Sequence, residues 1–126
     1  MISLEQVCMK YDRIIILASN DVREFLRTLN NIGIDAIAID YDPKFDDVDL
    51  TADLIIHKNV EKTYPVELPE GTDVILIGDN DQHNGDCTPI KSCEQLISLY
   101  DVGEIYDQGC DEEETHWYVY GKIRCR

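Results

Sequence analysis

One stretch of the chain gathers most of the side chains that could do chemistry. The apolar run Val74–Ile77 ends at Gly78, and the loop that follows carries Asp79, Asp81, His83 and Asp86. A buried strand that ends in carboxylates is where α/β proteins commonly place a ligand. Carboxylate oxygens on alternate residues of an extended loop suit Mg²⁺ or Mn²⁺. The pattern indicates a candidate metal site at Asp79 and Asp81, with Asp21 as a third ligand.

The same loop also fits a solvated turn that binds nothing. Asp and Asn side chains often bond their own backbone in turns, and glycine supplies positive φ at Gly78 or Gly85. The loop is not an EF-hand, because the sixth position of an EF-hand loop is glycine and this loop has Asn84 there. We therefore expect no cofactor, with Mg²⁺ or Mn²⁺ as the alternative.

An apolar strand followed by Asp79-x-Asp81 resembles the acidic motif of Toprim domains, the metal-binding catalytic module of primases and topoisomerases. The resemblance implies metal-assisted phosphoryl transfer at these two carboxylates. The chain departs from the Toprim pattern after its first strand, where Toprim domains have a catalytic Glu and this chain has Ser19–Asp21. Its glycine, Gly85, also falls one residue later than in Toprim domains. Whether the chain is an enzyme stays open, and the missing Glu favours a non-enzyme.

The second feature is charge. The net charge is −15, from 26 acidic and 11 basic residues, and two blocks dominate it: Asp40–Asp53 and Asp101–Glu114. Such a field repels the phosphates of nucleic acids and attracts basic proteins. Solubility is the alternative explanation. The sequence thus predicts a basic protein partner, no nucleic acid, and contacts through the acidic residues Asp46, Asp47, Asp49, Glu112, Glu113 and Glu114.

The C-terminal segment alternates with a period of two. One face carries Trp117, Val119, Gly121, Ile123 and Cys125, and the other carries His116, Tyr118, Tyr120, Lys122 and Arg124. This alternation predicts a half-buried antiparallel strand at a sheet edge. Tyrosine favours protein interfaces, so Tyr118 and Tyr120 join the acidic residues as candidate binding residues.

The elements that would position these residues form one small α/β domain over 1–126. Unbroken apolar runs predict that Ile14–Leu17, Ile34–Ile39 and Val74–Ile77 are central, parallel strands. Helices are expected from Asp21 to Gly33 and from Ser92 to Gly103. Ala52–His57 and Glu104–Asp107 are expected as short strands. The result is a mostly parallel central sheet in a Rossmann-like or flavodoxin-like order, flanked by helices, with a C-terminal antiparallel edge strand. We expect the core to include Ile16, Phe25, Leu29, Ile37, Leu76 and Trp117.

The composition limits the cellular location that we expect for such a domain. No apolar run approaches the ~20 residues of a membrane span, and the N-terminus has no secretory pattern. The five cysteines form no C-x-x-C pair, which favours reduced thiols and a cytoplasmic protein. We therefore expect a small acidic cytoplasmic binding module, of the inhibitor, immunity or anti-defence type, that caps a basic surface of a protein partner. The alternative is a divalent-metal-dependent phosphoryl-transfer or nucleotide-handling protein that uses Asp79 and Asp81.

Overall fold

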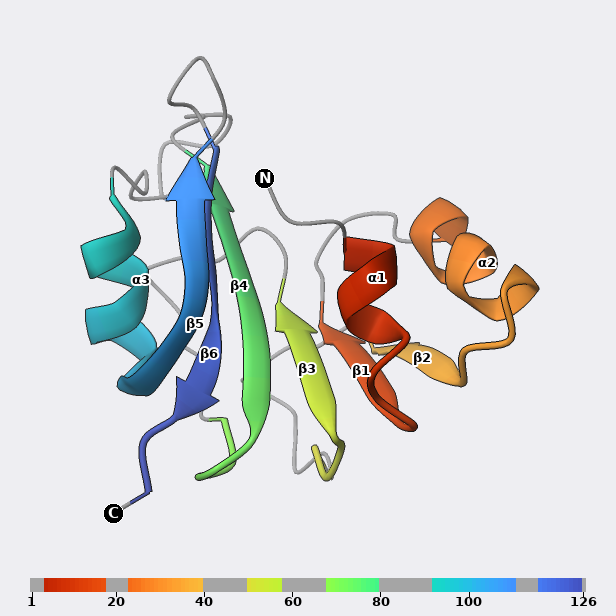
Figure 1. The fold of residues 1–126 in the computed structure, drawn as a ribbon, viewed down its shortest axis with the longest axis horizontal. Coiled ribbons are helices and arrows are strands. Elements are labelled where there is room, and N and C mark those ends of the chain that lie inside the picture. The colour runs from red at the N-terminus through yellow and green to blue at the C-terminus, as the bar shows by residue number, and fades with distance from the viewer. Residues whose placement is uncertain are drawn as a thin grey trace.

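The computed structural model describes residues 4–17, 23–39, 50–57, 68–79, 92–110 and 116–125. Within these ranges the chain forms three helices and six strands (Figure 1). The helices are α1 (Leu4–Cys8), α2 (Arg23–Asn31) and α3 (Cys93–Tyr100). The strands are β1 (Ile14–Leu17), β2 (Ala36–Ile39), β3 (Leu54–His57), β4 (Asp73–Asp79), β5 (Val102–Cys110) and β6 (His116–Ile123). None of these helices has the length and hydrophobicity needed to span a membrane.

The six strands form one mixed sheet in the order β2-β1-β3-β4-β6-β5. β1 pairs in parallel with β2 and β3, and β3 pairs in parallel with β4. β6 is antiparallel to both β4 and β5, so β5 runs in the same direction as β1–β4. The predicted parallel pairing of the first strands and the antiparallel last strand are therefore confirmed. The carboxyl ends of β1–β5 share one edge of the sheet, and their amino ends share the other.

The predicted positions of two strands are wrong. β6 lies inside the sheet between β4 and β5, and the edge strands of the described sheet are β5 and β2. β2 was expected to be central. Alternation and apolar runs report which faces of a strand are buried, but not how many of its hydrogen-bonding edges are paired. The sequence pattern therefore gave no information on which strands end the sheet.

Helices cover both faces of the sheet, which gives the molecule two hydrophobic clusters. α3 packs on the face that contains Ile15 and Leu17, together with β4–β6. Side chains of α1 and α2 pack on the opposite face, where Ile14 and Ile16 point. All four β1 side chains are almost completely buried. The unbroken apolar run of β1 is thus explained by burial on two sides.

The expected core is only partly right. Ile16, Leu29 and Leu76 have an exposed fraction of 0%. Trp117 is half-buried against the α3 cluster, and the side chain of Phe25 lies outside the described part. Ile37 is 45% exposed, so its predicted burial is wrong. It pairs with buried Ile15 but belongs to edge strand β2, at the margin of the cluster that covers Ile15.

Local signals set the ends of the helices. Gly33, at φ 86°, follows α2 as expected for a C-terminal stop, and the Ile34 N–H donates to the Leu29 carbonyl (3.0 Å). Ser92 caps α3 and accepts a bond from the Gln95 N–H (3.3 Å). α3 ends earlier than predicted, because Asp101 takes the left-handed conformation (φ 54°) before Gly103 is reached. β5 therefore begins at Val102 and is longer than the predicted strand.

Candidate functional site

The carboxylate of Asp73, the first residue of β4, accepts hydrogen bonds from two tyrosines. The Tyr11 hydroxyl donates to its Oδ2 atom (2.6 Å), and the Tyr106 hydroxyl donates to its Oδ1 atom (3.0 Å). The hydroxyl oxygens of Tyr11 and Tyr120 are also 2.6 Å apart, which is a hydrogen bond in one direction or the other. We call Tyr11, Asp73, Tyr106 and Tyr120 the tyrosine–aspartate cluster. It joins the segment before β1 to β4, β5 and β6.

An irregularity in β5 brings Tyr106 into this cluster. Ile105 pairs with Gly121 and Asp107 pairs with Tyr120, so Tyr106 is an extra residue on β5 without a partner on β6. Its ring packs edge-on against Tyr120, with centroids 4.9 Å apart. The shift also leaves two consecutive large residues partly in solvent: Ile105 and Tyr106 are each 41% exposed. The bulge thus creates an exposed aromatic and aliphatic pair on an edge strand.

Two tyrosines of the cluster, Tyr11 and Tyr106, are held in their neutral form. Burial, the hydrogen bond to Asp73 and contact with Tyr120 raise the pKa of Tyr11 well above its usual range. Partial burial and the hydrogen bond to Asp73 raise the pKa of Tyr106, which is still 41% exposed, to about 12. A neutral tyrosine donates a hydrogen bond and does not act as a base at neutral pH. Tyr11 and Tyr106 are therefore suited to binding and positioning and not to nucleophilic attack.

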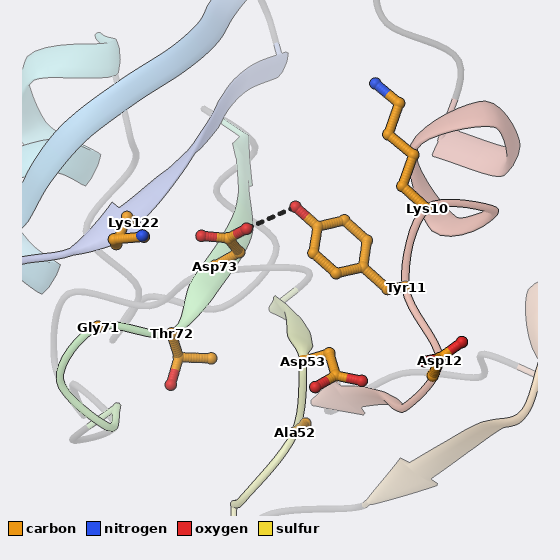
Figure 2. Close-up of a pocket in the computed structure, with 9 residues that line it drawn as sticks. All are labelled: Lys10, Tyr11, Asp12, Ala52, Asp53, Gly71, Thr72, Asp73 and Lys122. Carbon is orange, nitrogen blue, oxygen red and sulfur yellow. Dashed lines mark hydrogen bonds between the residues drawn. The ribbon is translucent and has the colours of Figure 1, made fainter.

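An open pocket of about 430 Å³ adjoins the cluster at the amino edge of the parallel strands (Figure 2). It is lined by Lys10, Tyr11, Asp12, Ala52, Asp53, Gly71, Thr72, Asp73 and Lys122. Figure 2 shows Lys122 beside Asp73, its pairing partner on the neighbouring strand, whereas Asp12 and Asp53 lie across the pocket. The Asp53 carboxylate accepts a bond from the Arg13 N–H (3.0 Å). Because the walls carry both charges, the pocket does not by itself select one class of ligand.

The predicted tyrosines lie on the expected face. Tyr120 belongs to the cluster, and the Tyr118 hydroxyl donates to Asp107 Oδ2 (3.2 Å). Both side chains are half-buried, whereas Val119 between them is fully buried on the opposite face. The alternation of β6 was enough to predict this arrangement.

Sequence reasoning missed Tyr11, Asp73 and Tyr106. Tyr11 and Asp73 are 62 positions apart, and no spacing in the sequence relates them. Tyr106 contacts Asp73 because of a bulge in β5, and no sequence pattern predicts this bulge. The signal that could have found part of the cluster is the short tyrosine-containing strand expected at Glu104–Asp107, beside a second strand rich in tyrosine.

The predicted metal ligands are largely outside the described residues. Asp79 ends β4 at the carboxyl edge, with its backbone opposite His116, but its side chain is not described. Asp21 and Asp81 lie outside the described ranges, as do the acidic candidates Asp46, Asp47, Asp49, Glu112, Glu113 and Glu114. In the residues that are described, no three His, Cys, Asp or Glu side chains converge as a metal site would require.

Two of the described cysteines, Cys8 and Cys93, lack the lowered pKa of a catalytic thiol. The Cys93 thiol donates to the carbonyls of Gly109 (3.4 Å) and Tyr118 (3.5 Å), and burial raises its pKa. Burial also raises the pKa of Cys8 to about 11. A thiol with a raised pKa is a poor nucleophile near neutral pH. Both groups therefore act as packing residues.

Compared with known proteins, the chain matches no family model and has no significant match among curated proteins. A function for it is therefore proposed from its own residues.

Proposed function

We propose that this chain is a small acidic binding module that caps a basic surface of a protein partner, and that the outer part of the sheet, β5 and β6, belongs to the contact surface. The observation that carries the proposal is the exposed pair Ile105 and Tyr106, which lies between the acidic residues Glu104 and Asp107. Because Ile105 pairs with Gly121 and Tyr106 packs against Tyr120, the two side chains lie on opposite faces of β5. A partner that contacts the outer edge of the sheet would cover both and neutralise the neighbouring carboxylates. Tyrosine is among the residues that contribute most to such contacts.

The charge of the described residues also supports β5 as part of the contact surface. Residues 92–110 contain four acidic side chains and no lysine or arginine: Glu94, Asp101, Glu104 and Asp107. The segment that contains β6 adds two bases, Lys122, which pairs with Glu104, and Arg124, whose Nε atom lies 3.4 Å from Asp101 Oδ1, so acids still outnumber bases four to two. Such an acidic surface speeds association with a positively charged protein and disfavours acidic ones. Nucleic acid is excluded from the proposal for the same reason, because its phosphates would meet these carboxylates.

Two further parts of the proposal concern fold and location. We infer a Rossmann-like or flavodoxin-like order for the parallel part of the sheet, supported by the order β2-β1-β3-β4, whereas the position of β6 between β4 and β5 departs from it. We place the module in the cytoplasm, in keeping with the unpaired thiols of Cys8, Cys93, Cys110 and Cys125.

The proposal is tested by comparing three immobilised proteins in capture from the native cell extract. They are the wild type, a Tyr106→Ser/Ile105→Ser variant and a matched Ile32→Ser/Ile37→Ser control, whose residues are exposed to 48% and 45%. We expect the wild type and control to retain one protein with a basic surface, which the first variant loses. Retention of that protein by all three, or capture of an acidic protein, would contradict the proposal.

A metal-dependent phosphoryl-transfer or nucleotide-handling protein is the second candidate. The position of Asp79 at the carboxyl end of β4 favours it, because parallel sheets bind ligands at that edge. Thermal unfolding with and without Mg²⁺ or Mn²⁺ tests this candidate. It predicts stabilisation by the metal in the wild type and none in Asp79→Asn/Asp81→Asn, and the absence of a shift in both proteins would count against it.

A further inference from the structure

β5 ends the described sheet with a long unpaired edge. It has nine residues and pairs with β6 on one side, and no other described strand pairs with it. In an edge strand, alternate N–H and C=O groups point away from the sheet and can template another strand. Proteins usually protect such edges with lysine, proline, bulges or short length. β5 contains neither lysine nor proline and is not short, and its protection consists of its bulges and the acidic residues Glu104 and Asp107.

The bulges of β5 leave a regular segment beyond them. The register shifts lie between Val102 and Asp107, and from Asp107 to Cys110 each residue pairs with the next residue of β6 in turn. Within this segment the Gln108 backbone N–H donates to the Asp107 carboxylate (2.9 Å). An added strand would have to replace this bond, which would release the carboxylate from Gln108 to pair with a basic residue. The segment has the extended geometry that an added strand requires, and exposed Ile105 and Tyr106 lie at its start.

The charge of this edge specifies what could pair with it. β5 carries Glu104 and Asp107 and no base, whereas the other edge strand, β2, has four uncharged residues, Ala36–Ile39. A second copy of this chain would bring like charges together on β5, which is destabilising. An extended segment with alternate lysine or arginine residues would instead place opposite charges across the new pair.

We propose that the outer edge of β5 receives an extended basic segment of a partner protein as an additional β-strand, paired along Asp107–Cys110 and flanked by Ile105 and Tyr106. This mode of binding rests on the proposed function and specifies it further. Backbone hydrogen bonds supply affinity, Asp107 selects a basic residue opposite it, and Glu104 selects another beyond the bulge.

The test uses the full chain and a nine-residue peptide of alternating lysine and threonine. Two further peptides carry N-methyl groups on every second residue, one in each of the two possible registers. All three have the same charge, but only one methylated register removes the N–H groups that face β5. We expect that register to bind at least about tenfold more weakly than the unmodified peptide at low salt, since about two backbone bonds to the outward-facing residues of Asp107–Cys110 are lost. The other register should bind nearly as well as the unmodified peptide.

The outcomes separate the two proposals. Equal binding of the three peptides would overturn strand addition and leave binding driven by charge alone. No binding of the unmodified peptide at low salt would contradict the acidic binding module as well. A Glu104→Gln/Asp107→Asn variant should weaken binding, whereas Asp35→Asn beside β2 should not. If the Asp35 variant weakens binding as much, β5 is the wrong edge.

Discussion

At the scale of single residues, Asp73 organises the candidate site. Its two carboxylate oxygens each accept a tyrosine hydroxyl, one from before β1 and one from β5. Hydrogen bonds to a charged acceptor are stronger than those between neutral groups. Asp73 therefore fixes Tyr106, and with it the exposed part of the bulge that we propose as a contact.

The first prediction follows from the raised pKa values of Tyr11 and Tyr106. Above about pH 10 an unfolded tyrosine loses its proton, whereas folded Tyr106, with a pKa of about 12, and Tyr11 keep theirs. The folded state then binds more protons than the unfolded state, so stability should fall as pH rises from about 10 towards 12. Urea unfolding followed by Trp117 fluorescence at several pH values measures this slope. The Tyr11→Phe/Tyr106→Phe variant should show a shallower fall.

The comparison controls for other alkaline groups. Cys8 also has a raised pKa, about 11, but it is present in both proteins and cancels in the difference between their slopes. Identical slopes for the wild type and the double variant would contradict the assignment of these two hydroxyls.

The second prediction concerns Gly121 on β6. A Cβ atom there would overlap the carbonyl oxygen of Glu104 and lie 2.9 Å from Val102 Cγ1. The Gly121→Ala variant should therefore lose on the order of 1–3 kcal/mol of unfolding free energy, as overpacked sites do. At Gly109 the nearest atom is in the Tyr118 ring, at 3.0 Å, and a ring can shift more readily than backbone. A larger loss for Gly109→Ala than for Gly121→Ala in urea unfolding would show that the backbone contact is not the limiting one.

At the scale of elements, sequence patterns predicted strand direction and side-chain face better than strand position. The apolar runs of β1 and β4 and the alternation of β6 gave parallel and antiparallel strands correctly. The edge positions of β2 and β5 were missed, because pairing of the second edge leaves the side-chain pattern unchanged. The tyrosine–aspartate cluster was missed for a related reason, since it depends on register across three strands. Only Tyr120 was named from the sequence.

The third prediction belongs to α2. Leu29 is fully buried between α2 and the sheet, so Leu29→Ala should cost about 2–5 kcal/mol of unfolding free energy. Ile32 follows the same helix but is 48% exposed, and Ile32→Ala should change stability by less than about 0.5 kcal/mol. Urea unfolding of both variants is the measurement. A loss below about 1 kcal/mol for Leu29→Ala would mean that α2 contributes little to this core.

At the scale of the whole molecule, the charge and the sheet architecture both indicate β5 and β6 as the binding surface. The chain carries a net charge of −15, and the described residues 92–110 contribute only acidic groups to it. Binding driven by this field should weaken as salt shortens the range of the attraction, to a Debye length of about 8 Å at physiological ionic strength. The two edge strands of the described sheet differ in charge, because β5 carries two acidic residues and β2 carries no charged residue.

The most direct test of the account is a map of backbone amide chemical shifts as the lysine–threonine peptide is titrated into the ¹⁵N-labelled chain at low salt. We predict that the largest changes fall on Val102–Cys110 and continue into β6, His116–Ile123, with little change on β2. Added salt should reduce them all in parallel. Changes centred on the carboxyl end of β4 near Asp79, or on β2, would contradict the assignment of the binding surface to β5 and β6.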